Sequence, residues 1–304
     1  MNAIERDFYE ERRRKWRRSA FWKGFFVAVL LAIVISFFAF SDSFRGSREH
    51  VARYQINGII SDSIERDDLL SDLARDQDAK AVILRINSPG GTTAGSESLF
   101  ASIRKIAEDR PVVAVMSEVA ASGGYVAAIA ADHIVARGNT VTGSIGVIME
   151  YPDLTNVLDR LGIEVETVRS SELKAEPSPW RPTNPAARAR DEALVAESFI
   201  WFRDLVGERR DLSGAELSEV ANGGIFTGRL AVANGLVDEL GGESEALAWL
   251  DSQQPGVGSL PVYDWKIEQD EPLLGRLLGR IGISKTFLSE ISRQGDLMLY
   301  SIGQ

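Results

Sequence analysis

Short apolar runs alternate with amphipathic stretches through most of the chain, from about residue 51 to residue 250. Residues 79–86 form a nearly continuous apolar run, which is typical of a strand that is covered on both faces. Residues 95–109 carry Leu, Phe and Ile at helical spacing, and residues 112–116 form a second buried strand. Residues 51–60 predict an earlier strand with a turn or bulge at Asn57-Gly58. The repeating strand and helix pattern predicts an α/β fold.

The same alternation continues toward the C-terminus with some interruptions. The sequence predicts strands at 134–136 and 165–168, and a long helix that begins after Asn184 and ends near Arg210. A proline-bearing segment, residues 171–179, predicts an irregular loop between them. After residue 250 the pattern fades, and residues 251–304 are predicted to be a C-terminal extension.

The stretch Ala120-Ala121-Ser122-Gly123-Gly124-Tyr125 lies between the strand at 112–116 and a helix of small residues that begins at Val126. Ser122 is therefore predicted at a strand-to-helix turn, where a hydroxyl is held on a rigid base. The two glycines let a substrate approach the backbone closely. Two interpretations stay open at this point: Ser122 is a nucleophile, or it caps the helix, for which serine is a preferred residue.

The N-terminal region has a different pattern and a different charge from the rest of the chain. Residues 1–23 contain eight basic and four acidic residues, although the whole chain has a net charge of -10. Residues 24–41 are uncharged and mostly apolar, long enough to span a bilayer. They predict an uncleaved transmembrane helix rather than a cleaved signal peptide, because Phe37-Phe38-Ala39-Phe40 does not resemble a cleavage site.

Basic residues before such a span remain in the cytoplasm, so residues 1–23 are predicted to be cytoplasmic. Residues 42–50 form a polar linker, and the domain at 51–250 is expected on the periplasmic or extracytoplasmic side of the inner (plasma) membrane. Membrane topology also explains the arginine cluster more simply than a nucleic-acid partner does.

The amino-acid composition argues against several kinds of functional site. The chain has no cysteine and two histidines, which excludes disulfides and cysteine nucleophiles and disfavours an imidazole metal site. We expect neither a metal nor a cofactor.

A serine nucleophile needs a base, and the candidates are few. His50 lies in the linker, and His133 begins an apolar strand where a packing role is the simpler interpretation. Of the seven lysines, Lys174 is the one outside the termini and the regular elements. By itself, a lysine in such a loop is more often a solvated surface residue than a base.

Several separate motifs resemble the signal peptide peptidase A family over residues 51–250. They are Asn87-Ser88-Pro89-Gly90-Gly91, Ala121-Ser122-Gly123-Gly124-Tyr125, Thr142-Gly143-Ser144-Ile145-Gly146-Val147, Lys174, and the run from Phe226-Thr227-Gly228 to Gly241. The resemblance implies a ClpP/crotonase-like fold, a spiral of ββα units. It also implies Ser122 as nucleophile, Lys174 as general base, and the N–H groups of Gly91 and Gly123 as the oxyanion hole.

The resemblance further implies a membrane-anchored serine endopeptidase that degrades remnant signal peptides and other apolar peptides through an acyl-enzyme intermediate. Because the chain carries one copy of each motif, a ring of identical subunits is expected, of which an octamer is one form. The alternative is a catalytically inactive crotonase-like protein that binds partners or assists membrane assembly.

Overall fold

The computed structural model describes residues 22–23, 25–33 and 49–267, which divide into a unit within Met1–Glu49 and a second unit that begins at His50. In the first unit, residues 22–23 and 25–33 are helical. The rest of the predicted span at 24–41, the basic segment 1–21 and the tail 268–304 lie outside the described residues. None of the helices in the described part is both long and apolar enough to cross a bilayer.

The second unit is built on a sheet that is mostly parallel. Its described residues form eight strands in the order β6-β5-β3-β2-β1-β8, with β4 beside β3 and β7 beside β4. All pairs are parallel except β5 and β6. The strands are β1 His50–Ile60, β2 Ala79–Gly91, β3 Val112–Ala121, β4 His133–Ala136, β5 Val141–Gly143, β6 Ile225–Thr227, β7 Glu239–Leu240 and β8 Val262–Trp265.

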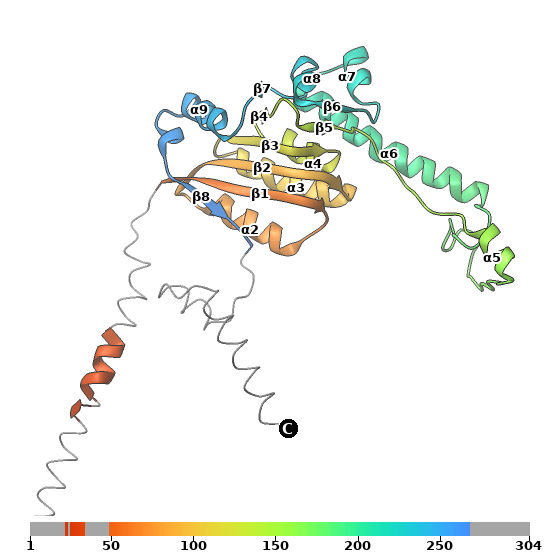
Figure 1. Cartoon of the computed structure of the whole chain (residues 1–304), viewed down its shortest axis with the longest axis horizontal. Coiled ribbons are helices and arrows are strands. Elements are labelled where there is room, and N and C mark those ends of the chain that lie inside the picture. The colour runs from red at the N-terminus through yellow and green to blue at the C-terminus, as the bar shows by residue number, and fades with distance from the viewer. Residues whose placement is uncertain (1–21, 24, 34–48, 268–304) are drawn as a thin grey trace, which may run out of the picture. The chain divides into compact units, whose positions relative to one another are not determined.

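Helices cover both faces of this sheet (Figure 1). The described helices of the second unit are α2 Ile64–Arg75, α3 Thr93–Ala107, α4 Gly123–Ile129, α5 Thr155–Leu161, α6 Pro185–Arg210, α7 Gly214–Val220, α8 Gly228–Ala233 and α9 Glu243–Gln253. Side chains of α2, α3 and α4 pack on one face in a large apolar core. Those of α9 pack on the other face in a smaller core. A mixed α/β architecture with a parallel-rich sheet fits a ClpP/crotonase-like fold.

Strand β2 shows why the sequence specifies this arrangement. Val82, Leu84 and Ile86 point into the larger core, and Ala81 and Ile83 point into the smaller one. All five are fully buried, because successive side chains of a strand face opposite sides of a sheet. The continuous apolar run predicted from the sequence is therefore confirmed as a strand covered on both faces.

Helix α6 joins the body of the domain to a projecting segment, which we call the arm and define as residues 150–184. The arm contains α5 and extends away from the sheet with the beginning of α6 (Figure 1). The predicted start of α6 is confirmed, since the side chain of Asn184 accepts a hydrogen bond from the N–H of Ala186 at 2.8 Å. Asn184 is therefore the N-cap of this helix.

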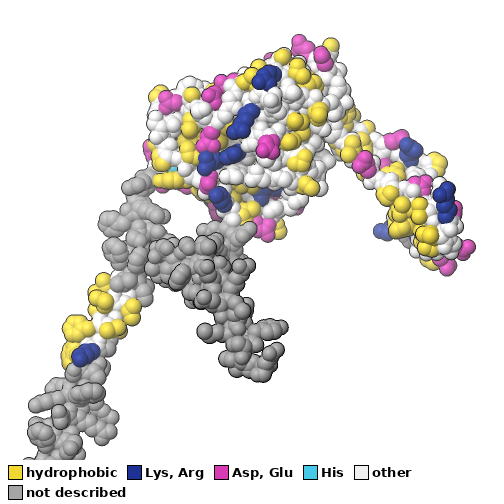
Figure 2. All heavy atoms as spheres, in the orientation of Figure 1, with side chains coloured by type: hydrophobic (Ala, Val, Ile, Leu, Met, Phe, Trp, Pro, Cys, Tyr) yellow, Lys and Arg dark blue, Asp and Glu magenta, His cyan; other side chains and the backbone are white. Residues whose placement is uncertain are grey.

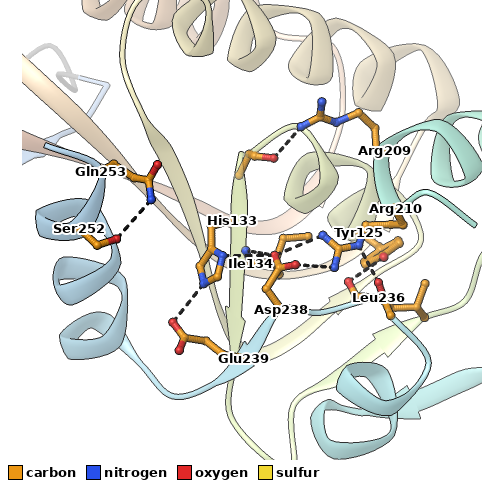
Figure 3. Close-up of polar contacts among 12 residues, drawn as sticks. Tyr125, His133, Ile134, Arg209, Arg210, Leu236, Asp238, Glu239, Ser252 and Gln253 are labelled. Carbon is orange, nitrogen blue, oxygen red and sulfur yellow. Dashed lines mark hydrogen bonds and ion pairs between the residues drawn. The ribbon is translucent and has the colours of Figure 1, made fainter.

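The C-terminal end of α6 is anchored beside α4 (Figure 3). Arg209 donates hydrogen bonds to the carbonyls of Ile129 and Ala131 at 2.7 and 2.8 Å, which satisfies orphan carbonyls after the last turn of α4. Arg210 pairs with Asp238 at 2.7 Å. One end of α6 is thus fixed to the helix that follows Ser122, and the other end supports the arm.

The structure differs from the sequence-based expectation at two places. Residues 165–168 form no strand, because they lie in the exposed arm, where the described residues offer no neighbouring strand to pair with. The pattern also failed to predict β8, a short strand that pairs with β1. The bulge at Gly58 is confirmed by a register shift between Asn57 and Ile59.

We expect the hydroxyl of Tyr125 to make a measurable contribution to stability. This fully buried side chain on α4 donates a hydrogen bond to the carbonyl of Leu236 at 2.8 Å (Figure 3), and burial raises the pKa of its phenol. Tyr125→Phe leaves that buried carbonyl unpaired and should lower the free energy of unfolding by about 1 to 3 kcal/mol. Urea denaturation of the purified protein measures the change.

Tyr263→Phe is the matched control, because Tyr263 is 43% exposed and its hydroxyl should contribute little. We expect it to stay within about 0.5 kcal/mol of the unchanged chain. Equal effects of the two substitutions would contradict this account of the Tyr125 hydrogen bond.

Candidate active site

Ser122 occupies a strained turn between strand β3 and helix α4. Its backbone has φ 52° and ψ -122°, a conformation that residues with a side chain rarely adopt. The residue holds the N-cap position, but its side chain makes no capping hydrogen bond. Helix capping therefore does not account for this serine. Strain of this kind persists only where the surrounding structure enforces it, and such positions gather at functional sites.

Hydrogen bonds on both sides of the turn hold Ser122 in place. Its N–H donates to the carbonyl of Gly143 on β5 at 2.9 Å, and its carbonyl accepts from the N–H of Val126 at 3.0 Å. The hydroxyl of Thr142 donates to the carbonyl of Ala120 at 2.6 Å. The turn is thus fixed to β5 as well as to its own strand and helix.

The Gly90-Gly91 turn at the end of β2 lies directly against this serine. A Cβ added to Gly90 would lie 2.8 Å from the Cβ of Ser122, and one added to Gly123 would lie 3.2 Å from the nitrogen of Gly91. The hydroxyl of Ser88 steadies the turn, because it donates to the carbonyl of Gly58 at 2.6 Å and accepts from the N–H of Gly90 at 3.1 Å. Three of the predicted site residues, Gly91, Ser122 and Gly123, therefore meet at one place.

A pocket of about 970 Å³ opens at these three residues. It extends from the Ser122 turn along the stretch after β5 and one side of α6. Its lining includes Gly91, Ser122, Gly123, Val126, Ser144, Ile145, Val147, Met149, Val195, Phe199 and Phe202, with Glu150, Arg188, Asp191 and Glu192 among the charged residues. The lining mixes polar residues such as Ser144 with partly exposed apolar ones such as Val147 and Phe199. The pocket has room for an extended peptide beside the serine hydroxyl.

The fourth predicted residue, Lys174, is not brought to this pocket within the described part of the chain. It lies in the arm, its side chain is exposed, and it is not among the residues that line the pocket. The next residue, Ala175, has a left-handed backbone with φ 61°. The loop around Lys174 is thus a defined turn in a segment that extends away from Ser122 (Figure 1).

His133 is also absent from the lining of the pocket that the described residues form. It stacks on Trp249 with ring centroids 4.8 Å apart. Its Nε2 lies 3.1 Å from a carboxylate oxygen of Glu239 (Figure 3). These contacts lie toward β7 and α9, on the side of the sheet that holds the smaller core. Its position agrees with the packing role inferred from the sequence.

Ser144 is a residue of the pocket that the sequence did not single out as a site residue. It lines the same pocket as Ser122, and its backbone is also left-handed, with φ 51°. Its N–H donates to the carbonyl of Gly224 at 2.7 Å. A serine after Gly143 gave no sign of strain in the sequence, since glycine and serine together are typical of ordinary turns. Ser144 is therefore a second serine with a left-handed backbone in the lining of this pocket.

Comparison with known proteins agrees with this geometry. Residues 104–256 match the sequence model of peptidase family S49. Two proteins that are each named "Putative protease" are 34% identical to this chain. The protein of Methanocaldococcus jannaschii aligns over 74% of this chain and 68% of its own length, and that of Synechocystis over 77% and 84%.

A longer relative extends the comparison to plants. The chloroplastic serine protease SPPA of Arabidopsis thaliana is 39% identical over 56% of this chain, which corresponds to 25% of the plant protein. The match to the family model spans half of the chain and includes the strand, turn and helix that carry Ser122. The chain therefore belongs to peptidase family S49, the family of the signal peptide peptidase A type.

Proposed function

We propose that the protein is a membrane-anchored serine endopeptidase in which Ser122 is the nucleophile and Lys174 is the general base. The observation that carries the proposal is the strained turn that holds Ser122 in the lining of the pocket, beside the glycines at 91 and 123. A ClpP/crotonase-like spiral of ββα units behind an N-terminal transmembrane helix is the architecture that fits this activity.

The chemistry follows from these positions. The hydroxyl oxygen of Ser122 attacks the peptide carbonyl as the neutral amine of Lys174 accepts its proton. The N–H groups of Gly91 and Gly123 stabilise the oxyanion, and the first N–H groups of a helix have no partner within it. The protonated lysine then gives its proton to the leaving amine, which leaves an acyl-enzyme that water hydrolyses. Each step uses groups of the chain, and no cofactor is needed.

The pocket lining favours apolar peptides as substrates. Val147, Val195 and Phe199 are partly exposed and line the same pocket as Ser122. Burial of such surface favours extended apolar segments over charged ones. Remnant signal peptides are the membrane-derived peptides that match this description, and we propose them as substrates together with other apolar peptides.

The position of Lys174 supports an active site shared between subunits. The arm carries Lys174 outside the pocket of its own chain, and its apolar side chains are unusually exposed. Figure 2 shows hydrophobic side chains on the surface of the arm. Val168 is 94% exposed and Leu161 is 66% exposed, which is costly in water unless another surface covers them. We propose a ring of identical subunits, such as an octamer, in which Lys174 of one subunit serves Ser122 of the next.

A lysine-to-arginine exchange tests the proposed base. Arginine keeps the charge and nearly the length of lysine, but it cannot act as a neutral base. Lys174→Arg should therefore lower kcat on an apolar fluorogenic peptide by about 100-fold or more, to a level near that of Ser122→Ala. Lys105→Arg, an exposed site on α3, is the control and should keep full activity. Appreciable turnover by Lys174→Arg would exclude this lysine as the base.

Mixed assemblies test the shared site. Ser122→Ala and Lys174→Ala chains should each be inactive, but a ring that contains both has junctions where an intact serine meets an intact lysine. Co-expression with two different affinity tags and purification through both tags isolates such rings. Their peptidase activity should be restored. Normal assembly of inactive mixed rings would show instead that the dyad forms within one chain.

The membrane orientation has a direct test in spheroplasts. The predicted topology places everything after residue 42 outside the cytoplasm. Protease added to intact spheroplasts should therefore digest the domain that begins near residue 51, with a cytoplasmic protein as the protected control. Digestion that requires permeabilisation would contradict the topology and the proposed localisation to the inner (plasma) membrane.

A further inference from the structure

Glu176 is the buried centre of the arm. Between residues 150 and 184, Glu176 and Ser178 are the two residues that the structure buries, and α5 contains no buried residue. The side chain of Glu176 is 1% exposed, although it follows Lys174 by two positions in an otherwise solvated segment. The arm thus has no apolar core among its described residues, and polar contacts must define its conformation.

Two arginines from either side of the Lys174 loop converge on this carboxylate. Arg181 donates from Nε to Oε1 of Glu176 at 2.7 Å, and Arg169 donates from Nη1 to the same oxygen. Hydrogen bonds from Arg181 and Arg169 hold the pKa of the Glu176 carboxyl below its ordinary value, despite its burial. Its second oxygen, Oε2, is buried and has no hydrogen-bond partner among the described residues. Glu176 therefore carries a negative charge between two fixed positive ones.

Arg169 and a third arginine also hold the backbone of the loop. Arg169 donates from Nη1 to the carbonyl of Glu172 at 2.7 Å, so this one guanidinium contacts residues both before and after Lys174. Arg190, on α6, donates to the backbone carbonyl of Glu176 at 2.8 Å. The loop that carries Lys174 is thereby closed on itself and tied to the helix that anchors beside α4.

We propose that Glu176 is a positioning residue for Lys174: through Arg169 and Arg181 its carboxylate fixes the loop and so sets where the lysine amine can reach. The proposal rests on the proposed role of Lys174 as the base. A buried ion pair contributes little to stability, because desolvation offsets most of the attraction, but it can select one conformation. A base must lie within hydrogen-bond reach of the hydroxyl it deprotonates, so the shape of this loop bears directly on catalysis.

Kinetics of Glu176→Gln give the first test. The substitution keeps the shape of the side chain and removes the charge that holds both arginines. Glu172→Gln is the matched control, an exposed glutamate of the same loop. We expect Glu176→Gln to lower kcat by about 100-fold with KM nearly unchanged, as for a misplaced catalytic group. Glu172→Gln should match the unchanged chain. If Glu176→Gln keeps the kcat of the unchanged chain, the proposal is wrong.

Placement of the same substitution in mixed rings separates positioning from folding. In a mixed ring, the Ser122→Ala chain supplies the working lysine and the Lys174→Ala chain supplies the working serine. Glu176→Gln on the Ser122→Ala chain therefore changes the loop of the working lysine. On the Lys174→Ala chain the same substitution changes a loop that has no lysine. We expect mixed rings to lose activity in the first case and to keep it in the second. Equal losses in both cases would mean that Glu176 only supports the fold or the assembly, which overturns the proposal.

Failure of the proposed function has a different signature in this experiment. If rings of Ser122→Ala and Lys174→Ala without any change at Glu176 are inactive, the shared dyad is refuted. The kcat comparison between Glu176→Gln and Glu172→Gln then decides the role of Glu176 alone. A Lys174→Arg chain with full activity would refute the base, and with it the reason for positioning this loop.

Discussion

The close approach of two turns is the constraint on which the site depends. The Gly90-Gly91 turn after β2 and the Ser122-Gly123 turn after β3 lie so near each other that an added Cβ on Gly90 would collide with the side chain of Ser122. Parallel pairing of β2 and β3 brings these strand ends to the same edge of the sheet. The strained backbone of Ser122 is tolerated because β5 and α4 hold it from both sides.

Much of this arrangement could be predicted from local sequence. The apolar run of β2, the glycines after it and the small residues of α4 each indicate their own element, and they agree with one another. The N-cap of α6 could also be predicted, because asparagine followed by proline is a strong helix-start signal. Where the local preference of a residue agrees with its role in the tertiary structure, the sequence pattern is sufficient to predict the element.

The features that were missed depend on tertiary contacts. β8 is short and pairs with β1 across more than two hundred residues of chain, so its local pattern carries little information. The left-handed backbone of Ser144 is imposed by its neighbours rather than by its residue type. The irregular arm could be predicted from its prolines, but the burial of Glu176 could not. A glutamate between two arginines is normally a solvated residue, and here the three-dimensional closure of the loop buries it.

The central claim is that Ser122, which the strained turn holds in the pocket, is the nucleophile. The most direct measurement is to treat the full chain with a fluorophosphonate and to map the modified residue by peptide mass spectrometry. Ser144, a second serine of the same pocket with a left-handed backbone, is the internal control. The account predicts modification of Ser122, with Ser144 left unmodified and no labelling of the Ser122→Ala chain. Modification of Ser144 in place of Ser122, or an unlabelled but correctly folded chain, would contradict it.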